Sequence, residues 1–257
     1  MCSRGPAAAL VALLVMLAAG GCNTTGDEAR LSSPYDEQQV WAVVPLRNES
    51  GSIEPDPMRI ADHLARQLET AEGLTVLAVN RVLSAMDAAG LASLEDPAQA
   101  QELRRLLNAD AIVVGTLTAY DSYDPPAIGL ALELFAGERW VEEPGHGLNV
   151  RELVRAGTDT LARPEHLEAG AAELMPASLV TGLWYAADPG VRRDMQRYAH
   201  RRGIDRDDPA GWQLYRISMD LFTEFVAFSA AERLLEAEAR RLRSPRGDDA
   251  GPPDNPS

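Results

Sequence analysis

Histidine is the first residue type to test for chemistry, because an imidazole can bind a metal or act as a general base near neutral pH. The chain has four histidines, His63, His146, His166 and His200. No two of them lie at the spacing of a metal-binding motif, and no cysteine lies beyond position 22 to join them. The sequence therefore predicts no metal site.

Carboxylates and hydroxyls are the next candidates, because paired acids or an activated serine could make an enzyme. Asp121, Asp124 and Glu133 could supply paired acids, but the stretch 121–126 is typical of a loop, so solvated turn acids are the simpler interpretation. Ser50 lacks the surroundings of a nucleophile elbow and is assigned to a turn. No glycine-rich phosphate loop is present either. We predict a protein that is not an enzyme and has no cofactor.

The strongest polar candidate is a run of arginines on one predicted helix after Asp188. Five of them fall on its exposed face, namely Arg192, Arg193, Arg197, Arg201 and Arg202. On an acidic chain this run could bind an acidic partner or a glycan polymer, so we keep it as a candidate partner surface. The alternative is that it balances the acidic stretch 205–208 that follows it.

Composition limits the partners of the chain. Its 257 residues carry a formal net charge of −15 and are 46% hydrophobic, which is enough to form a sizeable core. Nucleic acid and anionic lipid headgroups both select basic surfaces, so we expect direct binding to neither. The length fits one large domain, or one domain with an appendage.

Residues 1–21 have the pattern of an export signal. Arg4 supplies a positive charge, and Ala7–Ala19 is a continuous apolar run that is short for a transmembrane helix. Small residues then precede Cys22, which resembles the lipobox of bacterial lipoproteins, although Ala19 stands where that motif usually has leucine. The resemblance implies cleavage before Cys22 and attachment of lipid to its sulfur. The alternative is an ordinary secretory signal cleaved at about the same place.

Cysteine usage favours the lipoprotein. Cys2 would leave with the signal, so Cys22 would be the only thiol of an exported protein, where an unpaired thiol is a liability. We therefore predict a periplasm-facing protein that is anchored through lipidated Cys22, in the outer rather than the inner membrane. Residues 22–37 then form a tether, and residues 244–257 form a disordered tail.

Hydrophobic periodicity predicts the elements that position these residues. Short apolar runs typical of buried strands alternate with segments of helical spacing. The strands are expected at 40–46, 74–79, 111–117 and 128–135, and the helices at 58–72, 80–89 and 97–107. Helical crossovers make the first three strands parallel, and the last one returns antiparallel. The predicted fold class is α/β (α+β), a mixed sheet of about four to five strands packed with helices, plus a long C-terminal helix.

The stretch 103–135 is the centre of this fold. Leu103, Leu106 and Leu107 place an apolar stripe on the end of a helix, and the strand that follows is nearly continuous in apolar residues. Such a strand is typically covered on both faces. Polar residues mark where helices begin, and the predicted N-caps are Asn80, Asp96, Asp188 and Asp208.

Three motifs resemble a bacterial envelope family. Val43–Gly51 is similar to its first strand and loop, Leu74–Val82 to its second strand and helix start, and Ala109–Gly115 to its third strand. The family includes the amino-terminal domain of TolB, the curli secretion lipoprotein CsgG, and LpoB-like lipoprotein activators of penicillin-binding proteins. This chain has Leu46 where phenylalanine is usual and Asn108 where glycine is usual. The resemblance implies an α/β domain over 38–136, and the chain lacks the paired amphipathic hairpins of a CsgG-type pore.

Beyond this domain, residues 137–243 are predicted to form a helical extension that packs on it, with 179–186 as one added strand. The last helix, from Asp208, carries a wide apolar stripe. Its members are Trp212, Tyr215, Met219, Phe222, Phe225, Val226 and Ser229. We expect this helix to dock on the sheet of its own chain, and the alternative is a helix that binds a partner.

The sequence favours a non-enzymatic, lipid-anchored envelope protein that acts through protein–protein contacts. Assembly, transport and cell-wall regulation are the processes that fit. The alternatives from other classes are an enzyme that acts on an envelope polymer and a module that binds a small ligand. The first class is preferred because the motifs that match are structural and no set of residues resembles an active site.

Overall fold

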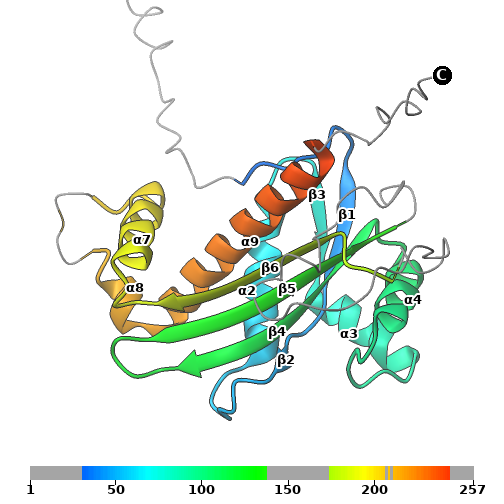
Figure 1. Cartoon of the computed structure of the whole chain (residues 1–257), viewed down its shortest axis with the longest axis horizontal. Helices are drawn as coiled ribbons and strands as arrows, with labels where there is room; N and C mark the ends of the chain where they lie inside the picture. The colour runs from blue at the N-terminus through cyan, green and yellow to red at the C-terminus, as the bar shows by residue number, and fades with distance from the viewer. Residues whose placement is uncertain (1–30, 138–173, 206–207, 209–210, 244–257) are drawn as a thin grey trace, which may run out of the picture.

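The computed structural model describes residues 31–137, 174–205, 208 and 211–243 (Figure 1). The predicted signal, the predicted lipidation site Cys22 and the predicted tail lie outside these residues, as do His146 and His166. Among the described residues, no helix is both long enough and apolar enough to cross a bilayer.

A six-stranded mixed sheet forms the centre of the molecule. Five strands lie in the order β3-β1-β4-β5-β6, and the short β2 pairs with β4 outside this path. β1 is parallel to β3 and β4, whereas the pairs β4–β5 and β5–β6 are antiparallel. The bounds are β1 Gln39–Val43, β2 Arg47–Asn48, β3 Leu74–Leu77, β4 Ala111–Asp121, β5 Ala127–Ala136 and β6 Ser178–Tyr185. The predicted fold class is confirmed, with β2 as a short strand inside the predicted loop.

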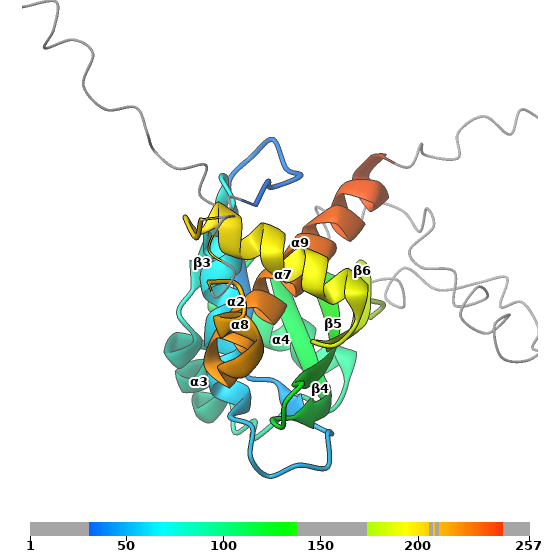
Figure 2. The same cartoon turned by 90° about the vertical axis from the view of Figure 1, so that its left-hand side faces the viewer.

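Helices cover the two faces of this sheet unequally (Figures 1 and 2). α2 and α9 bury the larger core on one face, and α7 and α8 add their apolar residues to it. α3 and α4 bury a smaller core on the other face, around Ile112 and Phe135. The bounds are α2 Pro57–Glu69, α3 Val79–Ala88, α4 Pro97–Leu107, α7 Pro189–Arg201, α8 Leu214–Ile217 and α9 Met219–Arg243.

α2 has the predicted amphipathic pattern with one exception. Its N-cap Asp56 accepts two backbone hydrogen bonds, at 3.0 and 3.2 Å, and the helix begins with a proline. Leu64 and Leu68 are buried in the larger core. Met58, the first residue of the predicted helix, is 44% exposed. Side chains of a helix tilt toward its N-terminus, so a residue in the first turn extends past the helix end.

The predicted caps at Asp96 and Asp188 are confirmed. Asp96 accepts a hydrogen bond from the N–H three residues on, at 2.9 Å, and Asp188 accepts from two N–H groups of α7. The cap predicted at Asn80 is wrong, because α3 begins one residue earlier, at Val79. The N-cap there is Ala78, which has no side-chain acceptor, so the chain enters α3 directly from β3 without a polar cap.

α4 ends in a residue of left-handed conformation. Asn108 has φ 51° and ψ 43° and caps the helix at the position where the resembling family has glycine. Asparagine is one of the few other residues that visit this region routinely, so it can stand in for glycine here. Leu103 and Leu107 are buried as predicted, but Leu106 is 58% exposed. Residues four apart lie closer on a helix face than residues three apart, and the core lies on the side of Leu103 and Leu107.

β4 is covered on both faces only in its first half. Ile112 and Val113 are fully buried, in the smaller and the larger core respectively, whereas Val114 is only half-buried. β4 also extends to Asp121, beyond its predicted end, because it pairs with β5 along its whole length. The prediction of a strand that is covered on both faces therefore holds for the beginning of β4 alone.

The last helix starts later than predicted. Instead of one helix from Asp208, the chain forms the short α8 and then α9, with Ser218 between them in an extended conformation (φ −103°, ψ 112°). Phe222, Phe225 and Val226 of the predicted stripe are fully buried, and α9 packs against α2, β5 and β6. α9 thus docks on the sheet of its own chain.

Candidate functional site

The predicted arginines lie on α7, a helix that the rest of the fold holds in place. Val191, Met195 and Tyr198 are buried in the larger core and fix one side of α7. All five predicted arginines are exposed, and we call them the arginine face: Arg192, Arg193, Arg197, Arg201 and, at the C-cap of α7, Arg202. Arg202 follows Tyr198 by about one turn and lies on the side that packs against α9, whereas Arg193 and Arg197 lie on the outer side of α7.

Carboxylates of α7 and α9 neutralise much of the arginine face. Arg197 pairs with Asp194 within α7, Arg201 lies 3.5 Å from Glu232, and Arg202 lies 2.9 Å from Glu224. For Arg192 and Arg193, the described part of the chain provides no ion pair within 4.0 Å. The unneutralised positive charge of the face therefore lies at the start of α7.

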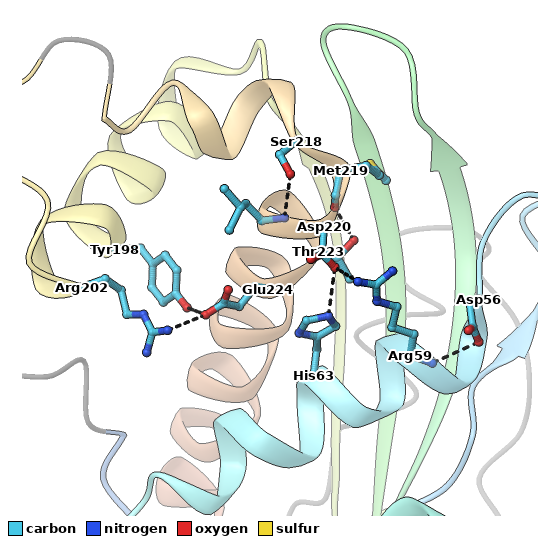
Figure 3. A network of polar contacts seen from close by, with 11 residues as sticks. Asp56, Arg59, His63, Tyr198, Arg202, Ser218, Met219, Asp220, Thr223 and Glu224 are labelled. Carbon is cyan, nitrogen blue, oxygen red and sulfur yellow. Dashed lines mark hydrogen bonds and ion pairs between the residues drawn. The ribbon is translucent and has the colours of Figure 1, made fainter.

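Glu224 of α9 joins α7 and its C-cap to α9 (Figure 3). Its Oε1 accepts hydrogen bonds from the Tyr198 hydroxyl at 3.0 Å and from Arg202 Nη2 at 2.9 Å. The Tyr198 ring also meets the Tyr215 ring edge-on, with centroids 5.5 Å apart. Burial, followed by the Glu224 charge, raises the pKa of both tyrosines above the ordinary value, so both phenols remain protonated at physiological pH. This network fixes α7 rigidly on α9.

His63 belongs to a second polar contact, between α2 and α9 (Figure 3). Asp220 of α9 lies 2.6 Å from Arg59 Nη2 and 3.5 Å from His63 Nε2, so it ties α9 to α2. His200 is exposed, and its Nδ1 lies 3.3 Å from the Ile204 carbonyl oxygen. The described residues contain no group of three or more histidines, cysteines and acids that could hold a metal ion.

The other residues weighed for chemistry lie in separate places. Ser50 is in a turn, where its backbone N–H and its hydroxyl both donate to the Asn48 side chain. Asp121 accepts from a backbone N–H two residues on, and Asp124 pairs with Arg216 of α8 at 3.2 Å. Asp121 pairs in register with Ala127 of β5. Glu133 lies six residues further along β5, about 20 Å from that position. Asp121 and Glu133 therefore lie far apart, and Asp124 is engaged with Arg216.

The predicted site residues do not include Glu238 of α9, a buried carboxylate that has no exposed surface. One of its oxygens accepts from the Tyr35 hydroxyl at 2.6 Å, and the other accepts from the Ser178 hydroxyl at 2.7 Å. Arg241, one turn further along α9, donates to both oxygens. The cluster joins the N-terminal segment, the start of β6 and the end of α9.

The charge of Glu238 is maintained by these donors. Burial raises the pKa of its carboxyl, but the hydrogen bonds and charge of Arg241, with the hydrogen bonds of Tyr35 and Ser178, outweigh it and lower the pKa below the ordinary value. One signal in the sequence points to part of the cluster, because Glu238 and Arg241 stand three residues apart on a helix. The contributions of Tyr35 and Ser178 come from distant segments and carry no local signal.

Comparison with known proteins adds weak similarities only. No protein-family model and no curated protein matches the chain. Lipoprotein GNA1162 from Neisseria meningitidis is 21% identical, with a TM-score of 0.32 over 38% of this chain and 72% of that one. The LpoB C-terminal domain from Salmonella enterica is 18% identical, with a TM-score of 0.32 over 48% and 81%. Hypothetical protein CT253 from Chlamydia trachomatis is 10% identical, with a TM-score of 0.34 over 80% and 96%.

Proposed function

We propose that this chain is a lipid-anchored protein of the cell envelope that acts through contacts with other proteins rather than by catalysis. The single observation that carries the proposal is Cys22, which follows an apolar export signal and small residues and is the only cysteine beyond that signal. Lipid on its sulfur explains why an exported chain keeps one thiol. The anchor would hold the domain at the outer membrane, facing the periplasm.

The positions of the family-like motifs in the fold support a protein that acts through contacts with other proteins. Val43–Gly51 includes the end of β1, all of β2 and the turn that follows, where the Asn48 side chain holds Ser50 and Ser52 by hydrogen bonds. Ala109–Gly115 leads into the buried start of β4. These residues build the sheet and its turns and offer no nucleophile or paired acid to a substrate.

The arginine face is the surface we assign to an acidic protein partner. Arg192 and Arg193 are exposed at the start of α7, and Tyr198 and Arg202 tie the helix to Glu224 of α9. A rigid cationic surface on a chain of net charge −15 would orient an acidic partner, since attraction is confined to this region. Its contribution would fall with salt, because surface charges are screened over about 10 Å at 0.1 M ionic strength.

Replacement of Cys22 tests the anchor. Cys22→Ser removes the sulfur that carries the lipid, so the protein should move from the membrane pellet to the soluble fraction or accumulate as an uncleaved precursor. Cell fractionation and blotting measure this, with wild type as the reference. A variant that is processed and still pellets like wild type would show that the anchor is not at Cys22.

Charge reversal tests the partner surface. Arg192→Glu with Arg193→Glu should abolish the recovery of acidic proteins that co-purify with wild type from gently solubilised membranes. Arg81→Glu on α3 is the matched control, because it reverses an exposed charge on the opposite face of the sheet. If the double variant keeps every partner that wild type and the control recover, the arginine face is not the contact surface.

A further inference from the structure

β6 is an edge strand that offers unpaired backbone to another strand. It pairs with β5 on one side, and no other described strand lies on its other side. Val180 and Trp184 point into the larger core under α9, whereas Thr181, Leu183 and Tyr185 face outward. Leu183 is 63% exposed. Among the described elements, β6 is thus open both along its edge and on its outer face.

The ladder between β5 and β6 determines which backbone groups are unpaired. The Ala186 N–H donates to the Pro126 carbonyl, which makes these two residues a hydrogen-bonded pair of the antiparallel ladder. Such pairs recur at every second residue. The backbone groups of Ser178, Val180, Gly182 and Trp184 therefore turn toward β5. Those of Leu179, Thr181 and Leu183 turn outward, away from the sheet.

β6 also lacks the features by which natural sheets protect an edge. Proteins usually shorten an edge strand, or place charges, prolines or bulges on it. Ser178–Tyr185 is eight residues long, with no charged residue and no proline, and it pairs with β5 without a register shift. The opposite edge, β3, has only four residues. One edge of the sheet is therefore short, and the other is long and open.

We propose that two copies of this chain associate through β6, in an antiparallel pair around a two-fold axis at Thr181. This register places Thr181 opposite its own copy and Leu179 opposite Leu183 of the other copy. All three are residues whose N–H and C=O groups turn outward, so each of these groups finds a partner. The two sheets then form one continuous twelve-stranded sheet.

The side chains of β6 suit this register. On the outer face, the leucine at 179 meets the leucine at 183 of the other copy, and threonine meets threonine, both favourable cross-strand pairs. On the inner face, Val180 meets Gly182, which carries no side chain of its own and lies under the Trp184 ring and Arg233. Gly182 is required there, because a Cβ would come within 2.7 Å of the Trp184 ring, over which Arg233 lies at 4.8 Å.

The charge of the chain favours a second copy at this edge rather than at another surface. A net charge of −15 opposes self-association wherever acidic side chains would meet. Glu133 of β5 is the acid that pairs in register with Leu179. In the proposed dimer, Leu179 and the other copy's Leu183 both lie between Glu133 and the β5 strand of the other copy. The inference is independent of the anchor and of the arginine face, and either could fail without affecting it.

A cysteine on the two-fold axis tests the register. Thr181→Cys would place two thiols opposite each other at a Cα separation of about 5.5 Å, within the range of a disulfide. Oxidation of membranes that carry the full chain should give a covalent dimer on a non-reducing gel. Thr118→Cys is the matched control, because Thr118 is also an exposed threonine but lies on the interior strand β4. No more dimer from Thr181→Cys than from this control would overturn the proposal.

A charge at the edge provides the second test. Two differently tagged copies of the full chain should co-purify. Leu183→Lys in both copies should abolish the co-purification, because it places a lysine opposite Leu179 of the other copy. Thr118→Lys should leave co-purification intact. Leu183 is largely exposed, so a thermal melt should show Leu183→Lys to be folded. Co-purification that survives Leu183→Lys would place any dimer contact elsewhere and contradict the proposal.

Discussion

A buried carboxylate is costly unless donors surround it, and Glu238 shows how this chain satisfies one. An unpaired ion in a protein interior costs several kcal/mol. Here Tyr35, Ser178 and Arg241 donate to both carboxylate oxygens, and Arg241 also supplies the opposite charge. The three donors come from the N-terminal segment, β6 and α9, so the cluster stabilises the fold only while these segments stay together.

Glu238→Gln should lower the free energy of unfolding by about 2–4 kcal/mol, because it leaves Arg241 poorly paired in a largely buried place. Urea denaturation measures this. Glu236→Gln is the control on the same helix, since Glu236 is exposed and lies 3.9 Å from Arg240, and it should change stability by less than about 0.5 kcal/mol. Equal effects of the two substitutions would show that Glu238 is not buried in this network.

The lowered pKa of Glu238 gives this contribution a pH dependence of known sign. Its carboxyl binds a proton less readily when folded than when unfolded, so the stabilisation is fully present above the ordinary pKa of glutamate. It is lost as the pH falls through the lowered value. The stability difference between wild type and Glu238→Gln should therefore shrink on acidification, and a difference that grows in acid would contradict this assignment.

Single residues show where sequence patterns are sufficient. Asp96 and Asp188 were predictable caps because each is followed by proline, so local chemistry alone fixes the start of the helix. The cap predicted at Asn80 was wrong. Asparagine is a common cap residue, but Asn80 lies inside a helix that begins directly after a strand. The distant partners of Glu238 were beyond prediction, since Tyr35 lies 203 residues away along the chain.

At the scale of elements, β4 shows how coverage varies along one strand. The apolar run that predicted a fully covered strand is real, but α3 and α4 reach only its beginning. Which part of a strand a helix covers depends on the crossing of distant elements, and the periodicity of the strand itself does not encode it. For the same reason, Leu106 and Met58 are exposed although they are apolar residues of amphipathic helices.

Two neighbouring substitutions test this uneven coverage. Val113→Asp buries an unpaired charge in the larger core, which costs several kcal/mol or forces the aspartate to take up a proton. Val114→Asp should cost less, because that side chain lies half-buried on the other face. Thermal melts of both variants measure the difference. If the two lose the same stability, both sides of β4 are equally covered.

At the scale of the whole molecule, the C-terminal helix completes the core that the first strands begin. α9 supplies fully buried aromatic residues to the larger core, and each contributes about 1.5–3 kcal/mol. The prediction of the fold from sequence succeeded for the sheet and its helices because their periodicities are strong. The start of α9 was missed, because Ser218 breaks the helix without proline or glycine.

Truncation tests whether the molecule folds as one unit. A chain that stops before Asp208 lacks α8 and α9 and so exposes the sheet face that they cover. Such an exposed apolar face promotes aggregation. We expect a truncated protein that aggregates or is quickly degraded, as limited proteolysis and gel filtration would show. A soluble monomer with a normal melt would mean that the first strands fold without α9.

The anchor and the folded domain lie close together in the chain. Leu31 is already buried, and the Tyr35 hydroxyl donates a hydrogen bond to Glu238. Both residues therefore belong to the folded domain, although they fall in the predicted tether. From Cys22 to Leu31 the chain can span about 30 Å at full extension. A lipidated Cys22 would therefore hold the domain, and any partner on α7, near the membrane surface.

The mass of the N-terminal peptide is the most direct test of the central proposal. Trypsin should release Cys22–Arg30 from the mature protein, because Arg30 is the first basic residue after the signal. We predict that this peptide begins at Cys22 and carries the mass of attached acyl chains. A mature protein that begins elsewhere, or a peptide with an unmodified cysteine, would contradict the assignment of this chain as a lipid-anchored envelope protein.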